Sequence, residues 1–259
     1  MNELARAIHE AATEKIRAHE RRRKVAHDET VRRQRRSTTP LPHLNARQPA
    51  FWAYDQSHDP YHVRARAAAI GHAIDASVKS GTYKPYPPTG FTVPKQGGRA
   101  RMVTTFAIAD EVVSKRLYAS LMNKNRARLS ARSYAYRNDL RVHDAIAHIQ
   151  SEWTSEHRLY VAQYDFTDYF GSIDHDHVWS TIAALGLAVT RTERRLLRSF
   201  MEAPLPTMLP TTMPASAPSR ERGIHQGTTI SLLLANIAAR RLIVSLSVLA
   251  FPSQDMQMT

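Results

Sequence analysis

The chain has 259 residues, 42% of them hydrophobic, and its 36 Lys and Arg residues outnumber 23 Asp and Glu residues to give a net charge of +13. It has no cysteine, which excludes disulfides and thiolate zinc sites and suits a cytoplasmic location. It also has no apolar run near 20 residues, so no membrane association is predicted. The positive charge favours nucleic acid as a partner, and a basic protein without such a partner is the alternative.

A highly basic helix is predicted over residues 2–36, which contain no glycine or proline, and a breaker-rich linker follows over 37–49. The second half of this helix, ERRRKVAHDETVRRQRR, has no continuous apolar stripe to bury. Two interpretations stay open, an arm that lies along a phosphate backbone or a solvated tail. In the first of these, Arg21, Arg22 and Arg23 are predicted to contact nucleic acid.

Globular patterns begin at Phe51. Amphipathic periodicity predicts helices over 62–80, 108–125 and 139–156. Between the first two, FTVPKQGGRARMVTTF predicts a hairpin of two short strands.

The second half of the chain is also predicted to be mixed in structure. RLYVAQYDFTDYF predicts a strand that ends in a turn, and a helix should follow from His175 to Leu185. Another helix should begin near Thr190, with Thr190 or Thr192 as its N-cap. A loop is predicted from Pro204 to Ser219, and the turn GIHQG then leads into a last helix.

The segment LYVAQYDFTDYFGSIDHDHV places Asp165 at the predicted end of a strand, where a carboxylate can project over a sheet face. Nucleotidyl transfer by two metal ions needs such groups, because Mg²⁺ prefers hard oxygen ligands. A lone aspartate at a strand end is more commonly a turn or cap residue. The Phe170 and Ser-Ile-Asp-His that follow distinguish Asp165 from that ordinary case.

The pattern D-x-x-x-[FY]-F-x-S-I-D-H resembles motif A of bacterial reverse transcriptases, the lineage of group II introns, retrons and phage-defence enzymes. The resemblance implies that Asp165 and the backbone carbonyl of Phe166 bind Mg²⁺, of which the intact family site holds two. It also implies that Phe170 is the aromatic gate that excludes a ribose 2′-OH. Four polar neighbours are interpreted instead as turn and cap residues: Asp168, Asp174, His175 and Asp176.

The segment RGIHQGTTISLLLANIAARRL resembles motif B of the same family, G-x-P-Q-G-[ST]-x-[IL]-S-P-L-L-A-N-I. The resemblance implies that Gln226 and Gly227 lie against the incoming nucleotide and the template base. Asn236 matches the asparagine of the family's helix. Two departures, His225 and Leu232, stand where the family has proline, and both are expected to loosen the turn.

Two further segments resemble the fingers of these enzymes. In VPKQGGRARMVTTFAIADEVVSKRL, Lys95 and Arg101 are implied to contact the triphosphate, with Arg99 as an alternative. A basic surface hairpin is the other interpretation, and Glu111 stands where the family often has arginine. In SYAYRNDLRVHDAIAHI, Arg137 is predicted to contact the template or to orient the catalytic strand, and a structural role is equally open.

The family's Y-[AIV]-D-D motif, which carries the remaining metal-binding carboxylates, does not occur in this sequence. We expect a truncation before that motif, caused by a shift of one base near Leu242, with residues 243–259 out of frame. Codons exist for Leu242-Ile243-Val244 that contain Asp-Arg in another frame, and codons for the last five residues contain Tyr-Ala-Asp-Asp. A chance match of degenerate codons is the alternative, and gene decay, sequencing error and programmed frameshifting stay open as causes.

The resemblance implies an α+β fold, the fingers and incomplete palm of a right-hand polymerase, with an antiparallel sheet packed on helices and no thumb. The basic helix and linker take residues 1–49, the fingers 50–150 and the partial palm 151–259. The implied function is RNA-directed DNA synthesis from an RNA template, a DNA or RNA primer and dNTPs, with a structured non-coding RNA as a further candidate partner. The chain alone is expected to be inactive, and a non-catalytic nucleic-acid-binding fragment is the alternative. Its biological programme stays open among intron mobility, a retron and antiviral defence.

Overall fold

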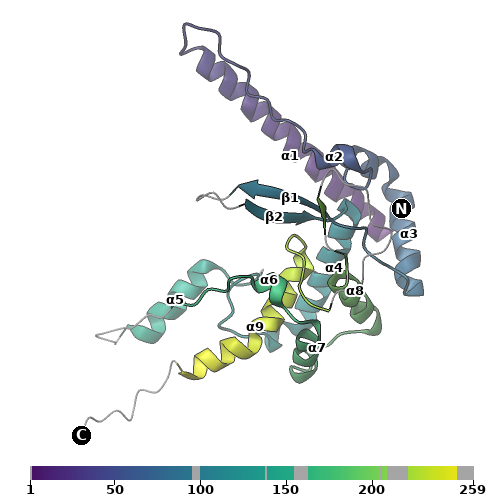
Figure 1. Ribbon diagram of the computed structural model, residues 1–259, viewed down its shortest axis with the longest axis vertical. Coiled ribbons are helices and arrows are strands. Elements are labelled where there is room, and N and C mark those ends of the chain that lie inside the picture. The colour runs from purple at the N-terminus through teal and green to yellow at the C-terminus, as the bar shows by residue number, and fades with distance from the viewer. Residues whose placement is uncertain are drawn as a thin grey trace. The chain divides into compact units, whose positions relative to one another are not determined.

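The computed structural model of the chain is mostly helical with one small sheet, which agrees with the predicted α+β class (Figure 1). It describes residues 2–94, 100–137, 139–154, 163–204, 206–208 and 221–249. No helix in these ranges is long and apolar enough to cross a membrane.

The chain divides into two compact units, which are described separately below. Unit 1 consists of Met1–Val113 and Pro206–Met213, and unit 2 consists of Ser114–Leu205 and Pro214–Thr259. The division falls inside a helix, whereas the sequence placed the boundary of its functional regions at residue 150. Those regions stay predictions.

In its described residues, unit 1 contains three helices, the start of a fourth and the sheet. Its elements are α1 (Glu3–Gln34), α2 (Phe51–Tyr54), α3 (Pro60–Ser80), β1 (Thr89–Pro94), β2 (Ala100–Thr105), the first residues of α4 (Ile108–Asn125), and β3 (Thr207–Met208). The predicted basic helix, the helix over 62–80 and the hairpin are therefore confirmed within a few residues.

The core of unit 1 forms where the first half of α1 packs along α3 and the start of α4. Small and branched side chains of α1 recur at helical spacing, among them Ile8 and Ala12, and they are fully buried. They meet Val63 and Ala67 of α3 and Ile108 of α4. Alanines alternate with isoleucines along this face of α1, and the helices pack closely at the small side chains.

Gly71 of α3 is the closest point of this seam. A Cβ atom built on Gly71 would lie 2.6 Å from both Cα and Cβ of Ala5 in α1, and 2.8 Å from its backbone nitrogen. A backbone neighbour cannot move aside as the end of a flexible side chain can. Glycine is required at position 71 because there is no room for a side chain, and not because of its backbone conformation, which is that of an ordinary helix.

The substitution Gly71→Ala is therefore expected to destabilise unit 1 by about 1–3 kcal/mol, the usual cost of overpacking a well-packed core. At an exposed helical position the same change would stabilise by roughly 0.5–1 kcal/mol, so the sign of the effect is diagnostic. Urea denaturation followed by circular dichroism measures it. The exposed Ala68→Gly variant serves as a propensity control, and a stabilised Gly71→Ala variant would contradict the close approach.

An ion pair also fixes α1 to α4. Lys15 Nζ lies 2.8 Å from Glu111 Oε2, and both side chains are partly shielded from solvent. Glu111 is the residue that departs from the family's usual arginine, so its charge has a partner on α1. An arginine at position 111 would instead face Lys15 with a like charge.

The sheet of unit 1 has the strand order β2-β1-β3. β1 and β2 pair antiparallel, with Phe91 opposite Val103, and β3 pairs parallel to β1 with Thr207 opposite Thr89. The predicted palm sheet is not among these strands. Most of its predicted strand at 158–165 lies outside the described residues, and residues 163–166 are not a strand.

Unit 2 is helical in its described part. It contains the rest of α4, a short 3-10 helix at Arg126–Arg128, α5 (Val142–Trp153), α6 (Tyr169–Ser172), α7 (His175–Ala184), α8 (Arg191–Met201) and α9 (Thr229–Leu249). The predicted helices at 108–125, 139–156 and 175–185 are confirmed. Most of the predicted loop at 204–219 and the chain beyond 249 lie outside the described residues.

Thr190 begins α8 with a reciprocal capping box. Its hydroxyl accepts from the backbone N–H of Glu193 at 3.2 Å, and the Glu193 carboxylate accepts from the backbone N–H of Thr190 at 2.8 Å. Glu193 also accepts from Lys124 and Ser120 of α4. The predicted N-cap is thus confirmed at Thr190, and its capping partner also joins α8 to α4.

Candidate functional site

The segment that contains Asp165 is built around two helix caps. Asp168 accepts from the backbone N–H of Gly171 at 3.2 Å and begins α6, and Asp174 accepts from that of His177 at 3.0 Å and begins α7. The interpretation of these two aspartates as turn and cap residues is confirmed. Asp165 itself lies in the exposed stretch before α6, and within the described chain its carboxylate has no hydrogen-bond or ion-pair partner.

Backbone hydrogen bonds join this segment to the one that precedes α9. The N–H of Ile224 donates to the carbonyl of Phe170 at 2.8 Å, and that of Gly223 donates to the carbonyl of Ile173 at 2.7 Å. The N–H of His175 donates in turn to the carbonyl of Glu221 at 3.0 Å. The two most specific sequence motifs, about 50 residues apart in the chain, therefore lie side by side.

The turn that carries Gln226 and Gly227 follows directly. Gly227 has φ of +136°, a conformation that side-chain-bearing residues rarely adopt, so glycine is needed for the backbone path. Gln226 next to it is half-buried. The turn ends at the start of α9, where the hydroxyl oxygens of Thr228 and Ser231 are hydrogen-bonded at 2.6 Å.

The expectation that His225 and Leu232 loosen this turn is wrong. His225 is buried, and its Nε2 lies 3.0 Å from the carbonyl oxygen of Ala203, so the ring ties the turn to the end of α8. Leu232 lies within the first turn of α9 and continues the helix. At the same helix start, the N–H of Ile230 donates to Ser114 Oγ at 2.9 Å. These contacts hold the turn without proline.

Three aromatic rings form a cluster with the predicted sugar gate, Phe170. Phe170 is 9% exposed, and its ring meets those of Tyr136 and Tyr169 edge-on at 6.0 and 5.8 Å. Phe166 stacks on Tyr169 at 4.8 Å. The Tyr169 hydroxyl donates to the Ala235 carbonyl, and its burial, with a smaller contribution from Tyr136, raises the pKa of Tyr169 to about 12. Phe170 is therefore held in one position.

Tyr136 and Tyr169 are the residues of this cluster to which the sequence assigned no role, and Tyr136 has the more unusual geometry. It has φ of +59°, unusual for a bulky side chain, and its ring is 45% exposed beside Phe170. The Tyr118 hydroxyl donates to the Tyr136 carbonyl at 3.2 Å and helps to hold this backbone. Strained backbone of this kind gathers at binding sites. Tyr136 belongs to the segment SYAYRNDLRVHDAIAHI, which resembles the family, but no glycine or asparagine at the position marks its unusual backbone conformation.

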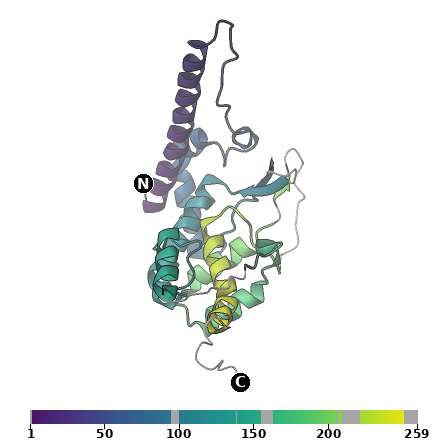
Figure 2. The same ribbon diagram turned by 90° about the vertical axis from the view of Figure 1, so that its left-hand side faces the viewer.

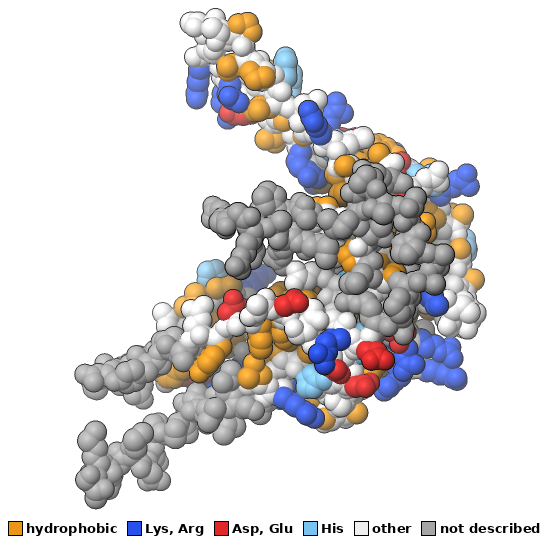
Figure 3. All heavy atoms as spheres, viewed as in Figure 1, with side chains coloured by type: hydrophobic (Ala, Val, Ile, Leu, Met, Phe, Trp, Pro, Cys, Tyr) orange, Lys and Arg blue, Asp and Glu red, His pale blue; other side chains and the backbone are white. Residues whose placement is uncertain are grey.

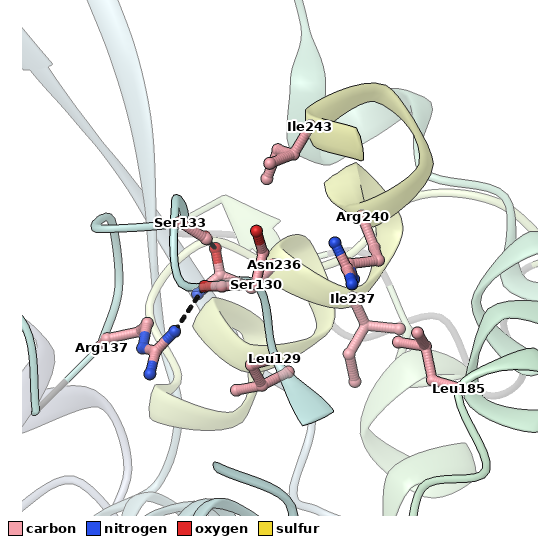
Figure 4. A pocket seen from close by; sticks show the side chains of 9 residues that line it. All are labelled: Leu129, Ser130, Ser133, Arg137, Leu185, Asn236, Ile237, Arg240 and Ile243. Carbon is pink, nitrogen blue, oxygen red and sulfur yellow. Dashed lines mark hydrogen bonds between the residues drawn. The ribbon is translucent and has the colours of Figure 1, made fainter. Parts of the chain in front are cut away.

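Arg137 is held inside unit 2. Its side chain is 6% exposed, and its Nε and Nη2 donate to Asp139 at 2.9 and 2.7 Å. Its Nη1 donates to the Ser130 carbonyl at 2.7 Å (Figure 4). These bonds with Asp139 raise the pKa of Arg137 against the opposing effect of burial. Of the two roles left open for Arg137, the geometry supports the structural one.

Asn236 connects α9 to the same loop. Its Oδ1 accepts from the Ser133 hydroxyl at 3.0 Å and its Nδ2 donates to the Ala135 carbonyl at 2.8 Å. The hollow between them is lined by nine side chains (Figure 4) and leaves no room for a water molecule. The asparagine of the second motif therefore positions the backbone that leads to Tyr136.

The predicted triphosphate contacts belong to unit 1. Lys95 and Arg99 lie outside the described residues, and Arg101 lies in β2 opposite Val93. Arg21, Arg22 and Arg23 are exposed on the second half of α1.

A magnesium site is not completed by the residues that the structure describes. Asp165 and the Phe166 carbonyl are adjacent in an exposed stretch and offer hard oxygen atoms. Within the described ranges, however, no group of three or more His, Cys, Asp or Glu residues could hold a metal ion. These residues alone do not fit a pair of magnesium ions.

The sequence was also compared with known proteins. No family model matches the chain, and no curated protein matches it. The relation to bacterial reverse transcriptases therefore stays a prediction from the sequence motifs.

Proposed function

We propose that this chain is part of an RNA-directed DNA polymerase, and that unit 2 carries one wall of its nucleotide site. The observation that carries the proposal is the hydrogen bonding of residues 170–175 to residues 221–224. These bonds bring Phe170 beside the turn of Gln226 and Gly227. The resemblance requires these two motifs to face one nucleotide, which needs such proximity.

The local geometry suits the roles that the resemblance implies. A steric gate needs a ring that cannot turn away, and Phe170 is held by two neighbouring rings and by its backbone bond to Ile224. Gly227 has no side chain to keep a nucleotide from the backbone. Tyr136 adds an exposed ring beside the gate, on which a base or sugar can pack.

Catalysis is a separate matter from nucleotide binding. Since the described residues do not complete a magnesium site, no catalytic step is assigned to them. We propose that the 259-residue chain does not polymerise by itself, and that the missing carboxylates are encoded in the shifted frame near Leu242. The second candidate function is a non-catalytic nucleic-acid-binding fragment, and the exposed cations of α1 favour it.

Two measurements test the proposal. The nucleotide sequence around codon 242 should encode Asp-Arg and then Tyr-Ala-Asp-Asp when the frame is shifted by one base. Primer extension on an RNA template with dNTPs and Mg²⁺ should then show no incorporation by the present chain and incorporation by the protein with the restored frame. Because Phe170 excludes the 2′-OH, rNTPs should be incorporated poorly.

Either of two outcomes contradicts the polymerase proposal. One is a shifted frame without Tyr-Ala-Asp-Asp, and the other is a restored protein that carries this motif and still incorporates nothing. Incorporation by the present chain would contradict only its proposed inactivity. In that case the carboxylates of the active site would have to be found elsewhere in the 259 residues.

A further inference from the structure

Helix α1 extends well beyond the core that it helps to form. Its regular series of buried residues ends at His19, whereas the helix continues to Gln34. The fifteen further residues add about 22 Å at 1.5 Å per residue. We call residues 20–46 the arm, which consists of this helical extension and the segment that runs back along it (Figures 1 and 2).

The returning segment is held to the helix by specific hydrogen bonds. The backbone N–H of Leu44 donates to Thr30 Oγ1 at 2.9 Å, and that of Leu41 donates to Gln34 Oε1 at 2.8 Å. Gln34 Nε2 donates to the Thr39 carbonyl at 3.2 Å. Thr30, the only buried residue of the arm, is buried under this segment. The arm therefore has a defined form of its own.

The arm carries a dense and largely unneutralised positive charge. Residues 20–36 include eight Lys and Arg residues against three acidic residues, and all eight cations are exposed. In the part of the chain that the structure describes, only Arg32 among them forms an ion pair, with Glu29 at 3.1 Å. Blue side chains accordingly mark the length of α1 in the space-filling view (Figure 3).

A hollow of about 480 Å³ lies between the helix and the returning segment. Four of its lining residues occur on α1 at spacings of three or four, which places them on one helical face. The lining consists of Glu20, Arg23, Lys24 and His27 from the helix and His43, Leu44 and Asn45 from the returning segment. Glu20 is the single acidic group, so the charge of the hollow is positive. Donors thus line it from both sides.

We propose that the arm binds nucleic acid independently of the nucleotide site, and that the hollow seats phosphates of the nucleic-acid backbone. Arg23 offers a planar fork of donors that suits phosphate oxygens, and Lys24 adds a compact charge. His27, His43 and Asn45 add further N–H donors around them. A nucleic-acid strand is favoured over a small anion because exposed cations continue along the arm beyond the hollow. They attract a long polyanion in general, whereas the hollow seats individual phosphates.

Salt dependence of binding tests the proposal with two matched variants of the full chain. Arg23→Gln with Lys24→Gln removes the cations of the hollow, and Arg33→Gln with Arg36→Gln removes the same charge from the arm outside it. Glutamine is a good helix former, so circular dichroism should show α1 intact in both. The probes are a labelled RNA hairpin, a DNA duplex of the same sequence and single-stranded RNA of the same length, followed by fluorescence anisotropy.

The hollow variant should make the negative slope of log Kobs against log salt concentration shallower by about 1.8 with a duplex, or about 1.4 with a single strand, because two phosphate contacts are lost. The matched variant should change the slope far less. The probe bound most tightly by the unaltered chain identifies the source of the phosphates.

Equal effects of the two variants would overturn the proposal, since they would show only a general attraction to charge. Failure of the unaltered chain to bind any probe would overturn it as well, and would direct attention to an acidic protein partner. Neither result depends on polymerase activity. If primer extension fails and the arm still binds nucleic acid, this inference stands. If the arm does not bind and primer extension succeeds, the polymerase proposal stands.

Discussion

In a protein whose reading frame restores Tyr-Ala-Asp-Asp, Asp165→Ala is expected to reduce nucleotide incorporation by about three orders of magnitude or more. The resemblance assigns Asp165 to the metal ions, whose stabilisation of developing charge contributes several kcal/mol. A change of about 1.36 kcal/mol in the activation free energy corresponds to a factor of ten in rate. Since Asp165 is exposed and has no partner among the described residues, its removal should leave the fold intact.

Asp176→Ala is the matched control for this substitution. Asp176 is an exposed aspartate of the same segment, in the first turn of α7, and it has no proposed part in binding. Its loss should leave incorporation within about twofold, because it removes only a weak interaction with the helix dipole. Single-turnover primer extension separates the two variants. Equal activity of Asp165→Ala and the unaltered restored protein would remove Asp165 from the proposed site.

Lys124→Met is expected to destabilise unit 2 by about 3 kcal/mol, the lower end of the cost of removing one partner from a buried ion pair. Lys124 Nζ lies 2.6 and 2.5 Å from the two carboxylate oxygens of Glu193. The Glu193 side chain is only 11% exposed, whereas that of Lys124 is 34% exposed, which limits the cost. Without Lys124 the buried carboxylate keeps its capping bonds and loses its counter-charge.

The same pair gives unit 2 an acid-sensitive component. Burial by itself raises the pKa of Glu193, but the hydrogen bonds from Lys124, Thr190 and Ser120 outweigh it and bring the pKa to about 2. A carboxyl whose pKa is lowered by folding stabilises the fold fully above its ordinary value near 4.5. This stabilisation should be lost as the pH falls from about 4.5 towards 2, and more weakly in Lys124→Met.

Denaturant unfolding at pH 7 and pH 3 measures both effects. Trp179, whose ring contacts Arg194 at 5.0 Å, supplies a fluorescence signal for the packing of α7 and α8. Lys115→Met is the control, because Lys115 is an exposed residue of the same helix in unit 2. An equal loss of stability in the two variants would show that the Glu193 pair contributes nothing particular.

The elements of this fold were largely predictable because their local patterns are strong. The helix at 108–125 follows from apolar periodicity, and α8 begins at Thr190 because Glu193 follows at capping-box spacing. Contacts between distant residues were not predictable in this way. Glu111 looked like an unexplained departure until Lys15, nearly a hundred residues earlier, proved to be its partner. Periodicity predicts which face of a helix is buried but not what covers it.

In the candidate site, too, local motifs were predictable from the sequence and contacts between distant residues were not. Its two motifs are visible in the sequence, but their proximity in space depends on backbone hydrogen bonds that no sequence pattern encodes. His225 looked like a loss of rigidity because only the missing proline was visible, not the Ala203 carbonyl that its ring contacts. Arg137 could have been assigned a structural role, since Asp139 two residues later is within reach of its guanidinium.

Helix α1 runs without a break from the core into the arm, so the core fixes the direction of the arm. The helix has no glycine or proline between Glu3 and Gln34, so it contains no built-in hinge. Anything bound by the arm therefore takes its orientation from the seam at Gly71 and Ala5. Each helical residue turns the chain by about 100°, so inserting or deleting one residue after His19 would redirect the hollow without altering a single phosphate-binding side chain. The length of α1 is thus as much a part of the proposed site as its arginines.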